Sequence, residues 1–128
     1  MRGMSLLEAA SRARHDLGKY ISFQARWVEP GAPVDTLREA LRDDLLRTRK
    51  GPDGVFTAAA LWRTLREPLL PLGIDRVDAL MELLTLRAAT LDTLDEAALL
   101  DTARLARDVA VELRAVHARA LSSKGTGA

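Results

Sequence analysis

The chain has 128 residues, of which 48% are hydrophobic and only 4% aromatic, and a formal charge of +1 from 19 basic and 18 acidic residues. This length suits one domain with one core, and an interior rich in Leu and Ala favours packed helices over a β-sandwich. Charges this closely balanced exclude a global electrostatic field that would hold nucleic acid or an anionic membrane.

The chain contains no cysteine, which excludes disulfides, thiol catalysis and cysteine-based zinc sites. The N-terminal segment lacks the apolar core of a secretory signal, and no apolar run approaches the roughly 20 residues of a membrane span. We therefore expect a cytoplasmic protein that has no membrane partner, no metal and no cofactor.

The first predicted helix runs from about Ser5 to Val28, because apolar residues recur there at helical spacing. The sequence "PGAP" at residues 30–33 ends it. A second helix is predicted to open at Asp35 or Thr36, where "TLRE" has the form of a capping box, and to continue to the basic turn before Gly51. A short third element, "TAAALWRTLRE", is expected to end near Pro68.

A fourth helix is predicted to begin near Asp75. Its inner face consists of Val77, Leu80, Met81, Leu84, Ala88 and Leu91. The fifth begins at a second capping box, "TLDE" at residues 93–96, and continues to about Leu121. The short connection between these two helices predicts an antiparallel hairpin.

No stretch has strand-like alternation of useful length. The chain is therefore predicted to be all-α: an up-and-down bundle of four main helices plus one short helix. We expect a single domain over residues 1–121 and a flexible C-terminal tail over residues 122–128, where the sequence is small and polar. Five residues in particular are predicted to be buried in the core, and they serve below as test residues: Leu17, Ile21, Leu41, Leu84 and Leu113.

The two histidines differ in their predicted surroundings. His15 lies almost opposite the apolar residues of the first predicted helix, so its imidazole is expected to face solvent near Ser11, Gly18 and Lys19. His117 falls on the apolar side of the last helix, where we expect a hydrogen-bonded ring with no functional role. These opposite orientations argue against a metal site that uses both rings.

The stretch "HDLGK", His15 to Lys19, resembles two families of phosphoryl-accepting helical bundles. It is similar to the start of the phospho-accepting helix of sensor-kinase dimerisation domains, and to the HxLKG signature of histidine phosphotransfer domains with the last two residues exchanged. The resemblance implies that His15 accepts the phosphoryl group, that Asp16 is the neighbouring acid or base and that Lys19 contacts the phosphate. It also implies a partner like a response regulator. Because the chain has no glycine-rich nucleotide-binding segment, only a relay role fits this resemblance.

Tyr20, Phe23 and Trp27 line one flank of the first predicted helix, beside its core residues. Such a flank either packs under a neighbouring helix, such as the one that contains Trp62, or stays open as a partner-binding surface.

A basic cluster near the end of the second helix is the third feature; it consists of Arg42, Arg47, Arg49 and Lys50. Because Asp43 and Asp44 lie among these residues, a solvated helix end explains the cluster better than a nucleic-acid partner. The leading hypothesis is a small non-enzymatic helical protein that binds another protein or itself through its first helix. The alternative is a phosphorelay carrier that uses His15.

Overall fold

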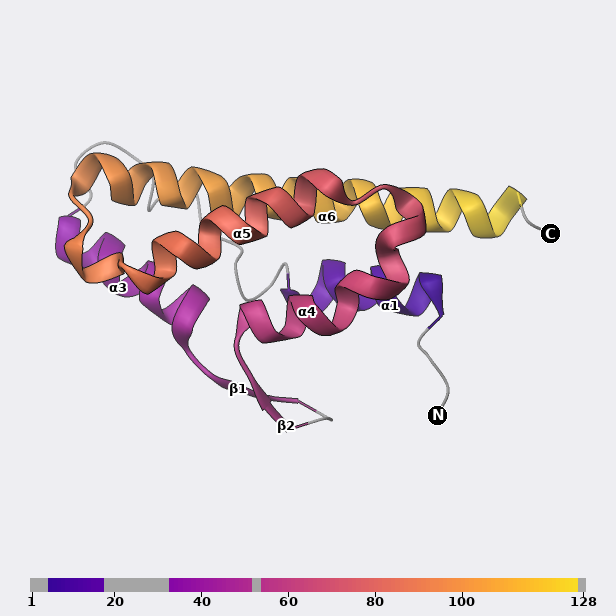
Figure 1. Ribbon diagram of the computed structural model, residues 1–128, viewed down its shortest axis with the longest axis horizontal. Helices are drawn as coiled ribbons and strands as arrows, with labels where there is room; N and C mark the ends of the chain where they lie inside the picture. The colour runs from indigo at the N-terminus through magenta and orange to yellow at the C-terminus, as the bar shows by residue number, and fades with distance from the viewer. Residues whose placement is uncertain (1–4, 18–32, 52–53, 127–128) are drawn as a thin grey trace.

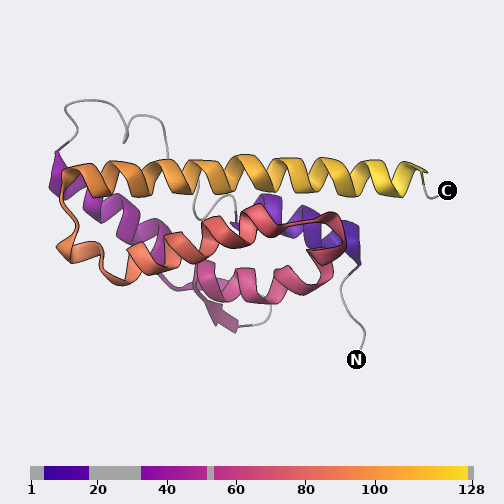
Figure 2. The ribbon, with the colours of Figure 1, turned by 45° about the horizontal axis from the view of Figure 1, so that its top comes forward.

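The longest helix, α6 (Glu96–Thr126), extends along the whole molecule, and the other helices lie on one side of it (Figures 1 and 2). The computed structural model describes residues 5–17, 33–51 and 54–126. Within those ranges it contains five α-helices and one short β-hairpin. The prediction of an all-α protein with packed helices is confirmed.

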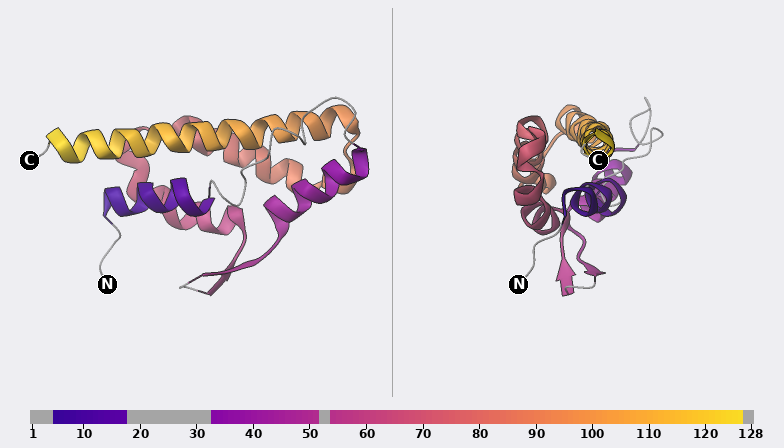
Figure 3. Two further views of the ribbon diagram at one scale, coloured as in Figure 1. Left: turned by 180° about the vertical axis from the view of Figure 1, so that it is seen from behind. Right: turned by 90° about the vertical axis from the view of Figure 1, so that its right-hand side faces the viewer.

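The remaining helices form two groups along α6 (Figure 3). In one group, α5 (Asp75–Ala89) runs antiparallel to α6, as predicted, and α4 (Ala58–Leu69) packs against α5. In the other, α1 (Leu6–Arg12) lies beside the C-terminal part of α6, and α3 (Val34–Leu46) lies beside its N-terminal part. The helices α1 and α3 therefore share one flank of the bundle.

A single core of Leu, Ala and Val side chains joins these helices. Four of the five test residues, Leu17, Leu41, Leu84 and Leu113, are at most 1% exposed, which confirms their predicted burial. The fifth, Ile21, lies outside the described residues. The predicted inner face of the fourth helix is buried in full.

The N-terminal helix begins as predicted but changes its winding after two turns. The Ser5 hydroxyl caps α1 by accepting a hydrogen bond of 3.1 Å from the Glu8 N–H. From Ala13 to Leu17 the chain forms a π-helical turn, and both end residues of this turn are buried. The predicted continuation to Val28 lies outside the described residues.

The second helix differs from the prediction at both ends. It starts at Val34 because Pro33, with φ of −61°, takes the N-cap position, and no side chain caps this end. The predicted capping box at Thr36 is wrong: Thr36 lies inside the helix, and the Glu39 carboxylate pairs with Arg42. The helix ends at Leu46, and the following residues are extended rather than helical.

A two-stranded antiparallel hairpin, absent from the prediction, follows α3. It pairs β1 (Arg49–Gly51) with β2 (Gly54–Phe56) and projects away from the bundle (Figure 1). The register places Gly51 opposite Gly54, whose φ of 110° is favourable only for glycine. Strands of three residues are too short to produce a readable alternation.

The later helix boundaries differ from the prediction by a few residues. Thr57 caps α4, and this helix includes Pro68 and ends at Leu69, followed by a 3-10 turn over Leu70–Leu72. At the start of α6 the cap is Asp95, whose carboxylate accepts a bond of 2.8 Å from the Ala98 N–H, so the predicted cap at Thr93 is wrong. The helix continues to Thr126, beyond the predicted end at residue 121.

Replacement of a core leucine tests this packing. Leu84 is 1% exposed, so Leu84→Ala should lower the free energy of unfolding by about 2–5 kcal/mol, because it leaves a cavity in the core. The matched change Leu121→Ala, at a side chain that is 50% exposed, should change it by no more than about 0.5 kcal/mol. Urea unfolding followed by circular dichroism measures both, and equal losses would contradict the described core.

Candidate functional site

His15 lies in the π-helical turn and is exposed, as the sequence predicts. The buried side chains of Ala13 and Leu17 on either side of it hold this turn against α4 and α6. The Asp16 carboxylate pairs with the Arg12 guanidinium at 3.5 Å. Lys19, the predicted phosphate contact, lies outside the described residues, so the structure places only His15 and Asp16 of this group.

The other histidine joins α1 to α6. His117 is half-buried, and its Nε2 atom lies 3.3 Å from the Ser11 hydroxyl. The sequence predicts Ser11 beside His15, but the Ser11 hydroxyl makes its contact with α6 instead. This contact agrees with the hydrogen-bonded ring that the sequence predicts for His117.

The predicted partner-binding residues Tyr20, Phe23 and Trp27 lie outside the described residues. Trp62, proposed as a neighbour for them, is 5% exposed and forms part of the core. Its indole N–H donates a hydrogen bond of 2.9 Å to the Asp78 carboxylate of α5.

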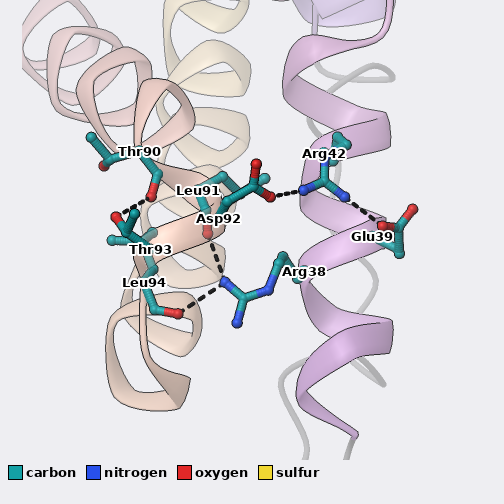
Figure 4. A network of polar contacts seen from close by, with 8 residues as sticks. All are labelled: Arg38, Glu39, Arg42, Thr90, Leu91, Asp92, Thr93 and Leu94. Atoms are coloured by element: carbon teal, nitrogen blue, oxygen red, sulfur yellow. Dashed lines mark hydrogen bonds and ion pairs between the residues drawn. The ribbon is translucent and has the colours of Figure 1, made fainter.

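The basic cluster at the end of α3 is partly neutralised within the fold. Arg42 pairs with Glu39 on its own helix and with Asp92 in the turn between α5 and α6 (Figure 4). Arg47 pairs with Asp43. The side chains of Arg49 and Lys50 are outside the described set.

Arg38, one turn before Arg42, has a structural role that the sequence did not indicate. Its guanidinium donates hydrogen bonds of 2.7 and 2.9 Å to the backbone carbonyls of Leu91 and Leu94 (Figure 4). These carbonyls belong to the turn that joins α5 to α6, and the Leu91 carbonyl also accepts a backbone hydrogen bond of 3.3 Å from the Leu94 N–H. Arg38 thereby ties α3 to the hairpin of α5 and α6.

A groove between α4 and α5, here called the α4–α5 groove, is a surface feature that sequence reasoning missed. Its volume is about 270 Å³. It is lined by Ala59, Trp62, Arg63, Arg66, Asp78, Met81, Glu82, Thr85 and Leu86. An apolar pocket of about 170 Å³ adjoins it, shares three of these residues and reaches Leu46 at the end of α3.

Large apolar side chains are exposed at this groove and near it. Leu86, which lines the groove, is 62% exposed, and Leu46, which lines the adjoining pocket, is 43% exposed. Leu83, on the same helix as Leu86 but outside both linings, is 48% exposed. The helix α5 therefore presents apolar residues on its outer surface as well as in the core, whereas a helix at a bundle surface ordinarily has a polar outer face. This second set of leucines in α5 was a readable signal in the sequence.

One polar arrangement fixes the two walls of the groove relative to each other. The Asp78 carboxylate accepts a hydrogen bond of 2.9 Å from the Trp62 indole and two of 2.8 and 2.9 Å from Arg66. Burial would raise the pKa of Asp78, but these hydrogen bonds and the Arg66 charge outweigh it, so the pKa lies below its usual value of 3.8. Asp78 is therefore a charged link between α4 and α5.

Among residues 5–17, 33–51 and 54–126, no group of three or more histidine, aspartate or glutamate side chains is placed to hold a metal ion. None of the helices in the described ranges is both long and apolar enough to cross a membrane. Comparisons with protein-family models, curated proteins and solved structures find no match to the chain.

The Asp78 link predicts a pH-dependent stability. The carboxyl pKa is lower in the folded chain than in the unfolded chain, so ionised Asp78 stabilises the fold above 3.8, and this contribution is lost as the pH falls through the folded pKa. Asp78→Asn should cost on the order of 1 kcal/mol at about pH 7, and its difference from the wild type should shrink toward about pH 3.

Urea unfolding across this pH range measures the effect. Asp108→Asn is the matched control, because Asp108 is exposed on α6 and has no ion pair among the described residues. If the two variants show the same pH dependence, Asp78 does not link the helices through its charge.

Proposed function

We propose that this protein is a non-enzymatic binding module that recognises a protein partner through the α4–α5 groove. The observation that supports this function is the exposed apolar side chains at this site: Leu86 lines the groove itself, and Leu46 lines the adjoining apolar pocket. Exposed apolar patches of this kind mark protein contacts, because covering them removes apolar area from water. The absence of cysteine supports a cytoplasmic location for this binding.

The shape of the groove fits a helical ligand. Two antiparallel helices form its walls, small residues such as Ala59 leave room between them, and charged residues lie at its edges. An amphipathic helix binds such a surface with its apolar side chains inserted and its polar side chains at the rim. This surface differs from the one expected at Tyr20, Phe23 and Trp27 of the first helix, which lies outside the described residues.

Site-specific photo-crosslinking in cells tests the proposal and identifies the partner in the same experiment. A photoreactive side chain in place of Leu86 should attach to one defined polypeptide, whereas the same group in place of Val111, which is 54% exposed on α6, should not. With that polypeptide purified, Leu86→Ala should weaken binding roughly tenfold or more, because burying a whole leucine side chain contributes about 1.5–3 kcal/mol and the truncation removes most of it.

The control for the affinity measurement is Val111→Ala, which should leave binding unchanged. Both variants must retain the helical circular dichroism of the wild type. Adducts formed equally at both positions, or at neither, would contradict the groove as the binding surface.

A phosphorelay role for His15 is the second candidate, favoured by the exposure of its imidazole on an anchored turn. Transfer from a phosphorylated donor protein would break the bond between phosphorus and the donor side chain, which leaves as the dephosphorylated donor, and would form a phosphorus–nitrogen bond at a ring nitrogen of His15. The phosphorus–nitrogen bond is labile in acid. This role predicts an acid-labile label that His15→Gln abolishes and His117→Gln retains. A wild-type chain that acquires no label, or a label that survives in His15→Gln, excludes it.

A further inference from the structure

The Asp78 link shows which residues of α4 lie at the same height as which residues of α5 along the α4–α5 groove. The helices α4 and α5 run antiparallel, and the contact between Arg66 and Asp78 sets which residues are level with each other. One turn along, Arg63 of α4 is level with Glu82 of α5. A further turn along, Ala59 is level with Leu86, and all four residues line the groove.

The residues at these two levels are complementary in charge or in size, but no ion pair or hydrogen bond joins them within the described part of the chain. Arg63 and Glu82 are exposed, and neither has an ion pair or hydrogen bond within the described part of the chain. At the next level, Leu86 is 62% exposed, whereas Ala59 opposite it leaves space above the α4 wall. Each wall of the groove therefore carries one member of a charge pair and one member of a large-and-small pair.

We propose that the occupant of the α4–α5 groove is a second copy of this chain, related to the first by a two-fold axis parallel to the groove. This inference rests on the proposed function. Such an axis places α5 of each copy over α4 of the other, so residues that are level within one chain face each other between chains. Arg63 then meets the partner's Glu82, and Leu86 enters the space above the partner's Ala59.

The same charges argue against a ligand of one sign. Arg63 and Arg66 lie on the α4 wall, and Glu82 and Asp78 lie on the α5 wall. A strongly acidic ligand would be repelled by one wall, and a strongly basic ligand by the other. A second copy related by the two-fold axis places its acidic α5 wall over the basic α4 wall and its α4 wall over the α5 wall. Every favourable contact therefore occurs twice.

Charge reversal tests this arrangement in the full chain. Sedimentation equilibrium should show a concentration-dependent monomer–dimer mixture for the wild type. Arg63→Glu and Glu82→Arg should each raise the dimer dissociation constant roughly tenfold or more, because each puts like charges opposite each other twice. The double variant exchanges the two charges and should return the constant to near the wild-type value.

The control variant is Arg104→Glu, which makes the same change in net charge at an exposed arginine of α6 that has no ion pair among the described residues. It should leave the dissociation constant unchanged. A contact between Arg63 and Glu82 within one chain would alter the melting temperature but not the mass, so mass is the deciding measurement. Circular dichroism checks that each variant is folded.

The outcomes separate this inference from the proposed function. A wild type that stays monomeric at all concentrations, single reversals without effect, or a double variant that is not restored would each overturn the two-fold dimer. If the chain is monomeric and the crosslink from position 86 captures a different polypeptide, the groove is a binding surface for that polypeptide and the second copy is excluded.

Discussion

The fold depends on the buried face of α6, which is long enough to contact helices from both ends of the bundle. Small residues make this possible: Ala103, Ala106 and Ala120 on α6 are at most 1% exposed. On the opposing helix α1, Ala9 and Ala10 are fully buried, as is Ala13 at the start of the following π-helical turn, so this segment and α6 meet through short side chains and their backbones lie close together. A helix of seven residues is marginal in isolation, and this close contact is what stabilises α1.

Because α6 takes one side of α5, the other side of α5 is left for α4 and solvent. The side toward α6 is held by ion pairs from Arg76 to Glu112 and from Arg87 to Asp101. On the side toward α4, the Asp78 link fixes the register of the two helices. Contacts on both flanks therefore hold in place the helix that carries the outer leucines. A helix that is already fixed by the fold needs less ordering when a partner binds to it.

The sequence predicted the helices well because their apolar spacing is strong, and it predicted their ends less well because caps depend on three-dimensional context. Thr36 and Thr93 each fit a capping box, yet Pro33 and Asp95 begin these helices. The hairpin was missed because three-residue strands carry almost no periodicity. Local sequence rules could not choose between competing caps a few residues apart.

For the candidate site too, features set by one helix could be predicted from the sequence, whereas features set by the packing of two helices could not. The exposure of His15 follows from helical spacing alone and was predicted, whereas the groove requires residues from α4 and α5 to come together. Leu86 was visible as an apolar residue outside the inner face of α5, but its place in the groove depended on the neighbouring helix across the groove. That neighbour is set by the Trp62 and Arg66 contacts to Asp78, which residue spacing within one helix does not reveal.

The position of α4 separates the two surfaces to which function is assigned. This helix packs against α1 and its π-helical turn on one side and against α5 on the other, so His15 and the α4–α5 groove belong to different helix pairs. A partner seated between α4 and α5 would contact the walls formed by those helices, whereas transfer to His15 would require approach to α1. The proposed binding through the groove and the proposed phosphoryl transfer at His15 therefore use different surfaces of the fold, although α4 supports both.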